Sequence, residues 1–349
     1  MRTSKLLFKI ISFLIVIILI NNLLVFLLKP YLGSSAEMWT LYKQKEDLTL
    51  IYTGSSQCIA GIRPDYVDSA SGYVSYNMGT NMQSVHNSKR AIEKAIKEHD
   101  IKVVFAVIDF QTLSMDRYSN YRAEASFQSA ENSIEDPLTR ITNTIGFVTD
   151  PEIIGTPGSV NFFFPWVYDR NTDIATNVKE KLSGQVLDAS KHRDQYGFES
   201  SDEVMDSNLV SISLEEAREW SNNTTAFQDL YITDSVRKSL KEMAEVCREN
   251  NVRLVAASIP YANHFSVYRL DDYQAVTNEL TEIFSGDNCA YYDFNLIKPE
   301  YFEIKSSYYR DVGHLNTEGA TAFSTFLGEF LVTSETTDVS DYFYDINEY

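Results

Sequence analysis

The sequence predicts an α/β domain built on a parallel five-stranded sheet and preceded by one transmembrane helix. The sheet is predicted because short apolar, β-branched runs alternate with amphipathic helical patterns along most of the chain. The membrane helix is predicted because residues 6–28 are almost all Leu, Ile, Val or Phe. Strands that are apolar on both sides favour a parallel sheet, since such a sheet is covered by helices on both faces.

The N-terminal apolar run is long enough to cross a hydrocarbon core of ~30 Å at about 1.5 Å per residue. Arg2, Lys5 and Lys9 precede or open it, so the positive-inside rule places the N-terminus in the cytoplasm and everything after Lys29 outside. A cleaved signal peptide, with the small residues 33–36 as a cleavage site, is the alternative. The run is long for a signal peptide, which favours a retained single-pass anchor in the cell membrane.

The amino-acid composition excludes some classes of function. The chain has 349 residues, 44% of them apolar, which is ample for a large core. Its net charge of −19 argues against nucleic-acid binding, which requires clustered Lys and Arg. Cys58, Cys247 and Cys289 have no metal-ligand spacing and are expected to be buried free thiols. Nothing in the sequence requires a metal or another cofactor.

The hydrophobic periodicity predicts the strands and helices along the chain. We expect residues 57–71 to form a loop with about one helical turn, and residues 334–349 to form an acidic tail that is solvated or docks through its tyrosines. The predicted strands are 48–56, 73–79, 102–109, 251–260 and 290–294, and the predicted helices are 82–99, 234–250, 271–284 and 317–331.

Between residues 110 and 226 the periodicity is lost. A structureless loop of that length is improbable, so we expect an insertion at about 111–226 with its own packing unit, which can cap the ligand crevice. Short helical candidates lie at 176–181 and 213–220. The aromatic run 161–166 either lines a binding groove through Trp166 or forms the core of the insertion. The expected organisation is thus residues 1–30 as terminus and anchor, 31–333 as the outer domain, and 334–349 as the tail.

Ser56 is the candidate nucleophile. It follows the first strand and Gly54, and in open α/β sheets ligands bind just outside the carboxyl ends of the strands. A serine hydroxyl needs a base oriented by a carboxylate, and His314 with Asp311 stands near the other end of the chain. In the alternative interpretation Ser56 caps a helix, and Asp311 and His314 are a helix-entry acid and a surface histidine. Ser55 is the neighbouring rival for the nucleophile.

These motifs resemble those of the SGNH hydrolase superfamily, whose fold is a flavodoxin-like three-layer sandwich. The resemblance rests on Gly-x-Ser at the first strand, a glycine after the second, and Asp-x-x-His before the last helix. It covers most of the chain after Leu48 except the insertion. The anchored outer domain further resembles the D-alanyl transfer protein of teichoic acid synthesis and alginate-type O-acetyltransferase accessory proteins. Those proteins work beside a polytopic membrane-bound O-acyltransferase.

The resemblance implies a role for each motif residue. Ser56 would attack an acyl carbonyl, His314 would take and return its proton, and Asp311 would hold the imidazole. The backbone N–H groups of Ser56 and Gly79 would stabilise the oxyanion. The family's third-strand Gly-x-Asn-Asp is absent, because the sequence there is Ile-Asp-Phe-Gln at 108–111.

That departure leaves the side-chain donor to the oxyanion open between Asn77, Asn81 and Gln111. Gln57 and Asp109 join Trp166 as candidates for binding substrate, although an aspartate after a strand can equally cap the following turn.

These residues and motifs are compatible with three functions. The first is acyl transfer or ester hydrolysis on a cell-surface polymer, such as teichoic acid or an exopolysaccharide. The second is a secreted esterase or lipase-like enzyme for small esters. The third is a non-catalytic binder of surface polymers that keeps the fold.

Overall fold

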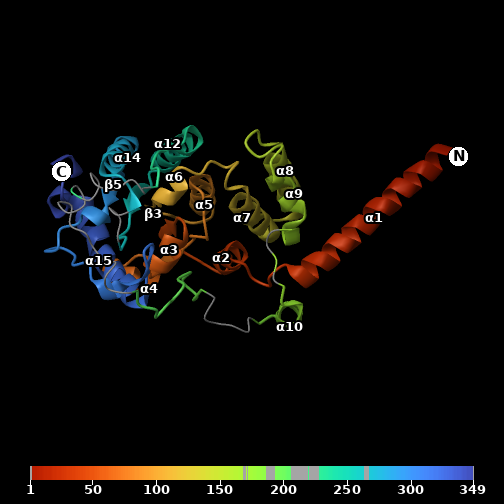
Figure 1. The fold of residues 1–349 in the computed structure, drawn as a ribbon, viewed down its shortest axis with the longest axis horizontal. Coiled ribbons are helices and arrows are strands. Elements are labelled where there is room, and N and C mark those ends of the chain that lie inside the picture. The colour runs from red at the N-terminus through yellow and green to blue at the C-terminus, as the bar shows by residue number, and fades with distance from the viewer. Residues whose placement is uncertain are drawn as a thin grey trace.

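The computed structural model describes residues 2–167, 170, 172–185, 193–205, 219, 228–262 and 267–348. A long N-terminal helix projects from an α/β body (Figure 1). The sheet has five parallel strands in the order β2-β1-β3-β4-β5, which confirms the predicted α/β class and the strand number. The strands are β1 (Leu50–Thr53), β2 (Ser75–Asn77), β3 (Val103–Val107), β4 (Arg253–Ser258) and β5 (Cys289–Asp293).

Alternate strand residues enter two hydrophobic clusters, one on each face of the sheet. Ile51 and Val104 belong to one cluster, and their neighbours Leu50 and Phe105 belong to the other, as the two-residue repeat of a strand requires. The first cluster includes residues of α5 (Val85–Glu98), α12 (Asp234–Glu249) and α14 (Leu270–Ile283). The second includes residues of α3 (Ser56–Gly61), α4 (Pro64–Ser71) and α15 (Thr317–Thr336).

Helices α3 and α4 occupy the stretch that the sequence predicts to be mostly loop, so that prediction was wrong. Each helix has a clear local cause. The Ser55 side chain caps α3 by accepting from the Gln57 N–H. Pro64 opens α4, and Gly72 ends it in the left-handed conformation at φ 79°.

The segment between β3 and α12, here called the β3–β4 segment, is largely helical in its described residues. The expectation of only short helices here is wrong, because α7 and α8 run for 14 and 13 residues. The helical candidate at 176–181 lies inside α10, whereas the one at 213–220 lies outside the described residues except for Glu219. The described elements are α6 (Phe110–Leu113), α7 (Tyr121–Ile134), α8 (Pro137–Thr149), α9 (Pro157–Phe163), η1 (Pro165–Val167) and α10 (Ile174–Ser183).

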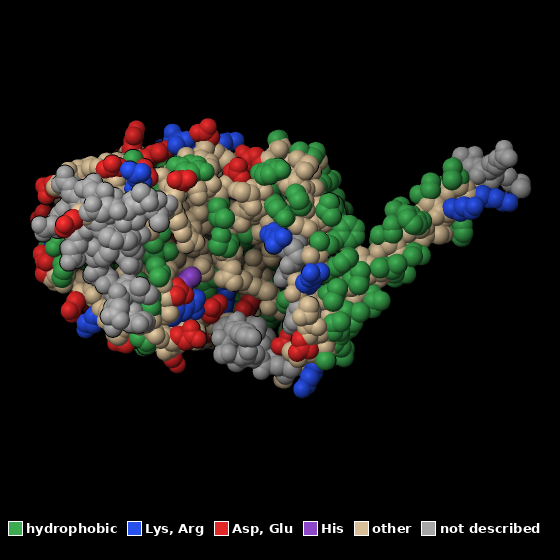
Figure 2. Space-filling view, in the orientation of Figure 1, with side chains coloured by type: hydrophobic (Ala, Val, Ile, Leu, Met, Phe, Trp, Pro, Cys, Tyr) green, Lys and Arg blue, Asp and Glu red, His purple; other side chains and the backbone are tan. Residues whose placement is uncertain are grey.

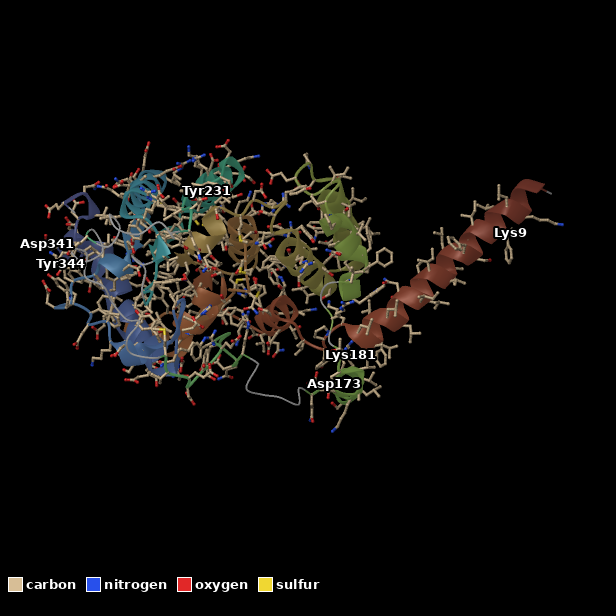
Figure 3. All side chains as sticks on the ribbon, in the orientation of Figure 1. Lys9, Asp173, Lys181, Tyr231, Asp341 and Tyr344 are labelled. Atoms are coloured by element: carbon tan, nitrogen blue, oxygen red, sulfur yellow. The ribbon has the colours of Figure 1, made fainter. Side chains whose placement is uncertain are left out.

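Helix α1 (Arg2–Leu28) contains a stretch of 24 residues that is long and apolar enough to span a membrane. Its C-terminal part contacts the β3–β4 segment. The Trp166 Nε1–H donates to Asn21 Oδ1 at 2.8 Å, and Asn21 Nδ2 donates to the Phe163 carbonyl at 3.0 Å. Lys181 Nζ donates to the Val25 carbonyl at 2.8 Å, close to where α1 ends (Figure 3). A short helix, α2 (Ser34–Tyr42), then leads to β1.

The residues after 334 are docked on the body. Helix α15 continues to Thr336, and beyond it the Phe343 ring stacks on Tyr292 with ring centroids 5.6 Å apart. Tyr342 stacks on Tyr301 at 3.9 Å. Of the two expectations for this tail, docking through aromatic side chains is the one that the structure shows, because burying these rings outweighs the solvation of a mostly acidic stretch.

Candidate active site

The candidate site lies at the carboxyl end of β1, where three predicted residues meet. Ser56 is the first residue of α3. Asp311 ends the short strand β6 (Tyr309–Asp311), and His314 begins β7 (His314–Leu315), which pairs with β6. Helix α15 follows, capped by Asn316, and packs along α3 and α4. The packing of α15 therefore brings the two ends of the sequence together.

The three side chains form a continuous hydrogen-bonded chain. Ser56 Oγ lies 2.8 Å from His314 Nε2. His314 Nδ1 lies 2.8 Å and 3.0 Å from the two carboxylate oxygens of Asp311. A carboxylate can only accept, so Nδ1 carries the proton and Nε2 presents its lone pair to the serine hydroxyl. The arrangement can therefore remove a proton from Ser56 as the hydroxyl attacks an electrophile.

Asp311 is held in its ionised form although it is partly buried. Burial alone would raise the pKa of its carboxyl group. The hydrogen bond from His314, the Gly313 N–H at 2.8 Å and the charge of Arg310 outweigh this effect, so the pKa lies below its ordinary value. About half of the Asp311 side chain stays exposed, at 54%.

Ser55, the rival serine, has a structural position. Its hydroxyl accepts from the Gln57 N–H as the cap of α3 and donates to Asp109 Oδ2 at 2.5 Å. The capping role that was the alternative for Ser56 therefore belongs to Ser55. Asp109 in turn caps α6 through the Gln111 N–H and is only 5% exposed. Burial raises the pKa of Asp109, and both of its oxygens are engaged within the protein, which leaves no oxygen free of a partner for substrate.

Asn77 does not fit the predicted oxyanion role. It is fully buried, and its amide donates to the carbonyls of Cys58 at 2.7 Å and Ile62 at 3.2 Å. Its Oδ1 accepts from the Gly79 N–H at 3.0 Å. The amide therefore has no hydrogen left for a substrate, and the Gly79 N–H is already engaged. Ser56 is different, because the first N–H groups of an α-helix have no intrahelical acceptor.

The remaining oxyanion candidates are both exposed side chains. Asn81 is anchored through its backbone N–H, which donates to Ser34 Oγ at 3.1 Å. Gln111 Nε2 donates to the hydroxyl of Tyr261 at 3.2 Å. The Tyr261 hydroxyl also lies close to Gly313, because a Cβ added to that glycine would be 3.2 Å from it. Tyr261 therefore lies between Gln111 and the loop that carries Asp311.

Sequence reasoning missed Tyr261. The available signal was its position directly after Pro260, at the carboxyl end of β4 and hence at the same edge of the sheet as Ser56. Burial raises its pKa to about 12, so the phenol keeps its proton.

The two remaining substrate candidates lie in different places. Gln57 follows Ser56 in α3 and is buried, with 6% of its surface exposed. Trp166 lies in η1 against α1, where its indole N–H is bonded to Asn21. The prediction that Trp166 lines the groove at Ser56 is therefore not supported, and its observed partner is the apolar helix.

No family model and no curated protein matches this chain. Its function is therefore inferred from its own geometry. The described residues contain no group of three or more His, Cys, Asp and Glu side chains arranged to hold a metal ion. Cys58 lies close to the site but is buried, and burial raises the pKa of its thiol. Its Sγ donates to Asn77 Oδ1 at 3.2 Å, which assigns it to the packing beneath the site.

Proposed function

We propose that this chain is an extracytoplasmic serine acyltransferase or esterase that acts on acyl esters of a cell-surface polymer, a teichoic acid or an exopolysaccharide. The observation that carries the proposal is the 2.8 Å contact between Ser56 Oγ and His314 Nε2, with Asp311 on the opposite ring nitrogen. Nucleophile, base and orienting carboxylate in this order constitute the arrangement that activates a serine hydroxyl.

The proposed reaction has two halves. Ser56 Oγ attacks the acyl carbonyl carbon while His314 Nε2 takes the hydroxyl proton, and the tetrahedral intermediate collapses as His314 protonates the departing alcohol. The ester at Ser56 is then attacked by an acceptor hydroxyl in a transferase, or by water in an esterase. His314 takes the proton of that attacking group and returns it to Ser56.

The oxyanion is stabilised in this proposal by the N–H groups of Ser56 and Gly79. Ser56 opens a helix, so the helix dipole adds to its hydrogen bond. Gly79 N–H points to Asn77 Oδ1 in the structure and must share that bond with the substrate oxygen. We infer that substrate binding includes this local adjustment.

The strand order supports the proposed fold family. An order of 2-1-3-4-5 in a parallel sheet is that of the flavodoxin-like folds, in which ligands bind at the carboxyl ends of the strands. On this interpretation the β3–β4 segment is an insertion into a flavodoxin-like SGNH domain. The same resemblance makes a polytopic O-acyltransferase of the same membrane the proposed source of the acyl group.

The contacts of α1 support a retained anchor over a cleaved signal peptide. Asn21 bonds to two groups of the β3–β4 segment, and Lys181 bonds to the carbonyl of Val25. A signal peptide is removed from the mature protein and has no reason to complement it. With Arg2, Lys5 and Lys9 on the cytoplasmic side, the catalytic body lies outside the membrane.

The test uses the full-length protein in detergent micelles. A fluorophosphonate probe should label the wild-type chain covalently, and a chromogenic acetyl ester should be hydrolysed. Ser56→Ala should abolish labelling and lower hydrolysis at least 10³-fold. Ser69→Ala, at an exposed serine of α4, is the matched control and should behave as wild type.

Failure of the wild-type chain to take the probe would refute the proposal and favour the non-catalytic binder. Equal labelling of Ser56→Ala would refute Ser56 as the nucleophile. Transfer of the acyl group to an added polyol in preference to water would identify the transferase, and free hydrolysis would identify the esterase.

A further inference from the structure

Helix α8 carries an apolar stripe that faces away from the protein. Leu138, Ile141 and Ile145 follow the spacing of one helix face, and they are 74%, 58% and 56% exposed. A helix on a water-soluble domain normally turns such a stripe toward the core. The one buried residue of α8 is Phe147, which lies outside that stripe.

Neighbouring elements extend this stripe into a surface. Ile154, Val160 and Phe163 are 60%, 53% and 48% exposed. Helices α8 and α9 pack together on their buried side through Phe147 and Phe162, whose ring centroids lie 4.8 Å apart. We call the whole set the apolar surface: Leu138, Ile141, Ile145, Ile154, Val160 and Phe163. Figure 2 shows hydrophobic side chains gathered on the side of the body next to α1.

The apolar surface is continuous with the candidate membrane helix. The carbonyl of Phe163, a member of the surface, accepts from the Asn21 side chain of α1. Three residues later the Trp166 N–H donates back to the same asparagine. These bonds also explain how Asn21 is accommodated in an apolar helix, since an asparagine in lipid needs hydrogen-bonding partners.

Charge is sparse along this part of the chain. The protein has a net charge of −19, yet residues 137–167 contain only Arg140, Asp150 and Glu152 as charged residues. Both acids lie within ion-pairing distance of Arg117, at 2.6 Å and 3.7 Å. Arg117 also pairs with Glu124, and the exposed Asp136 caps the N-terminus of α8, so this part of the chain is low in charge rather than neutral. A low density of carboxylates reduces the repulsion from an anionic headgroup layer.

The length of α1 determines the depth of the apolar surface relative to the membrane. The apolar stretch of 24 residues is ~36 Å long, about 6 Å more than a hydrocarbon core of ~30 Å. If the stretch enters lipid at its N-terminal end, it leaves the core near Val25, and Asn21 lies roughly 6 Å deeper. The Trp166 N–H, which is bonded to Asn21, then lies on the acyl-chain side of the interface, and the Lys181 ammonium, which is bonded to the Val25 carbonyl, lies at the edge of the hydrocarbon core.

We propose that the apolar surface of α8 and α9 is seated in the outer leaflet of the membrane, beside α1. The partner is the lipid bilayer itself. The body is thus fixed to the membrane by a helix that spans it and by a second, interfacial contact. This inference rests on the proposed anchoring by α1, but it is independent of the chemistry at Ser56.

Site-directed spin labelling of the full-length protein in liposomes that contain only phospholipid tests the proposal. Single cysteines are introduced at Ile141 and Ile145 in a Cys289→Ser background, since the other two cysteines are buried. Leu14→Cys on α1 reports the anchor. Asp341→Cys, at the end of the molecule opposite Lys9 (Figure 3), reports the aqueous phase.

Labels at Ile141 and Ile145 should be several-fold more accessible to oxygen, relative to a water-soluble nickel chelate, than the label at Asp341. Water-like accessibility at Ile141 and Ile145 with a lipid-like Leu14 would overturn the proposal while leaving the anchor intact, and would favour a protein partner for this surface. A water-like Leu14 would overturn the anchor as well. Exposed positions are chosen so that the substitutions leave packing unchanged.

Discussion

Ser55 Oγ donates a hydrogen bond to the buried carboxylate of Asp109 over 2.5 Å while also capping α3. The adjacent serine, Ser56, instead faces His314. Two neighbouring hydroxyls thus have separable roles, one in holding the turn and one in the proposed chemistry.

We therefore expect Ser55→Ala to lower stability but not to prevent acylation. The variant loses a helix cap and a partner of a buried carboxylate, which should reduce the free energy of unfolding by about 1–3 kcal/mol. Urea denaturation measures the loss, and fluorophosphonate labelling of Ser56 should persist. Complete loss of labelling in a folded Ser55→Ala protein would reassign the nucleophile.

Asp311→Asn should slow the proposed acyl transfer with little effect on substrate binding. The amide cannot hold the His314 tautomer that presents Nε2 to the serine, and in serine enzymes this change costs up to ~10⁴-fold in kcat. More than half of the Asp311 side chain is exposed, so water can partly replace it, and we expect a loss of roughly 10²- to 10³-fold. Steady-state hydrolysis of a chromogenic ester should show the loss in kcat and an unchanged KM; an unchanged kcat would remove Asp311 from the mechanism.

Asn77→Ala should destabilise the protein strongly, whereas Asn81→Ala should not. Removing the Asn77 side chain leaves the carbonyls of Cys58 and Ile62 and the N–H of Gly79 without that partner in the interior, at about 1–3 kcal/mol for each unsatisfied group. Asn81 is exposed and bonds through its backbone, so its truncation should stay within about 0.5 kcal/mol. Chemical denaturation of the two variants compares their free energies of unfolding. Similar losses of stability would contradict the structural role assigned to Asn77.

Asp293 should make the protein less stable as pH rises. Burial raises its pKa from 3.8 to about 6, so the folded state holds a proton that the unfolded state has released between these values. Stability then falls as pH rises from about 4 to about 6.

Asp293→Asn removes this titration. The free energy of unfolding of the variant minus that of wild type should therefore be larger at pH 7.5 than at pH 4.5, by about 2 kcal/mol. Urea denaturation at the two pH values gives the difference. An equal effect of the substitution at both values would show that Asp293 titrates normally.

The sheet and the candidate triad could be predicted from the sequence because both depend on local patterns. Apolar runs predict buried strands, and the carboxyl ends of parallel strands share one edge, so Ser56 could be placed there without coordinates. The association of His314 with Ser56 was inferred from chemistry, since a serine needs a base.

The helices of the β3–β4 segment could not be predicted in the same way. Helix α7 buries the polar residues Glu124, Gln128 and Glu131, and this hides the apolar periodicity of a core helix. Helix α8 has that periodicity but turns it outward. The engagement of the Gly79 N–H by Asn77, and the position of Tyr261 beside Gly313, depend on tertiary packing and have no local signal.

The distance along the chain between Ser56 and His314, 258 residues, has a consequence for biosynthesis. Ribosomes make the serine early and the histidine late, and the imidazole reaches the serine through the docking of α15, which lies near the C-terminus. On the proposed topology a partly exported chain therefore has no activated hydroxyl. Any product of premature termination before residue 314 would sit in the membrane chemically inert, so competence for acylation marks a fully translated and translocated molecule.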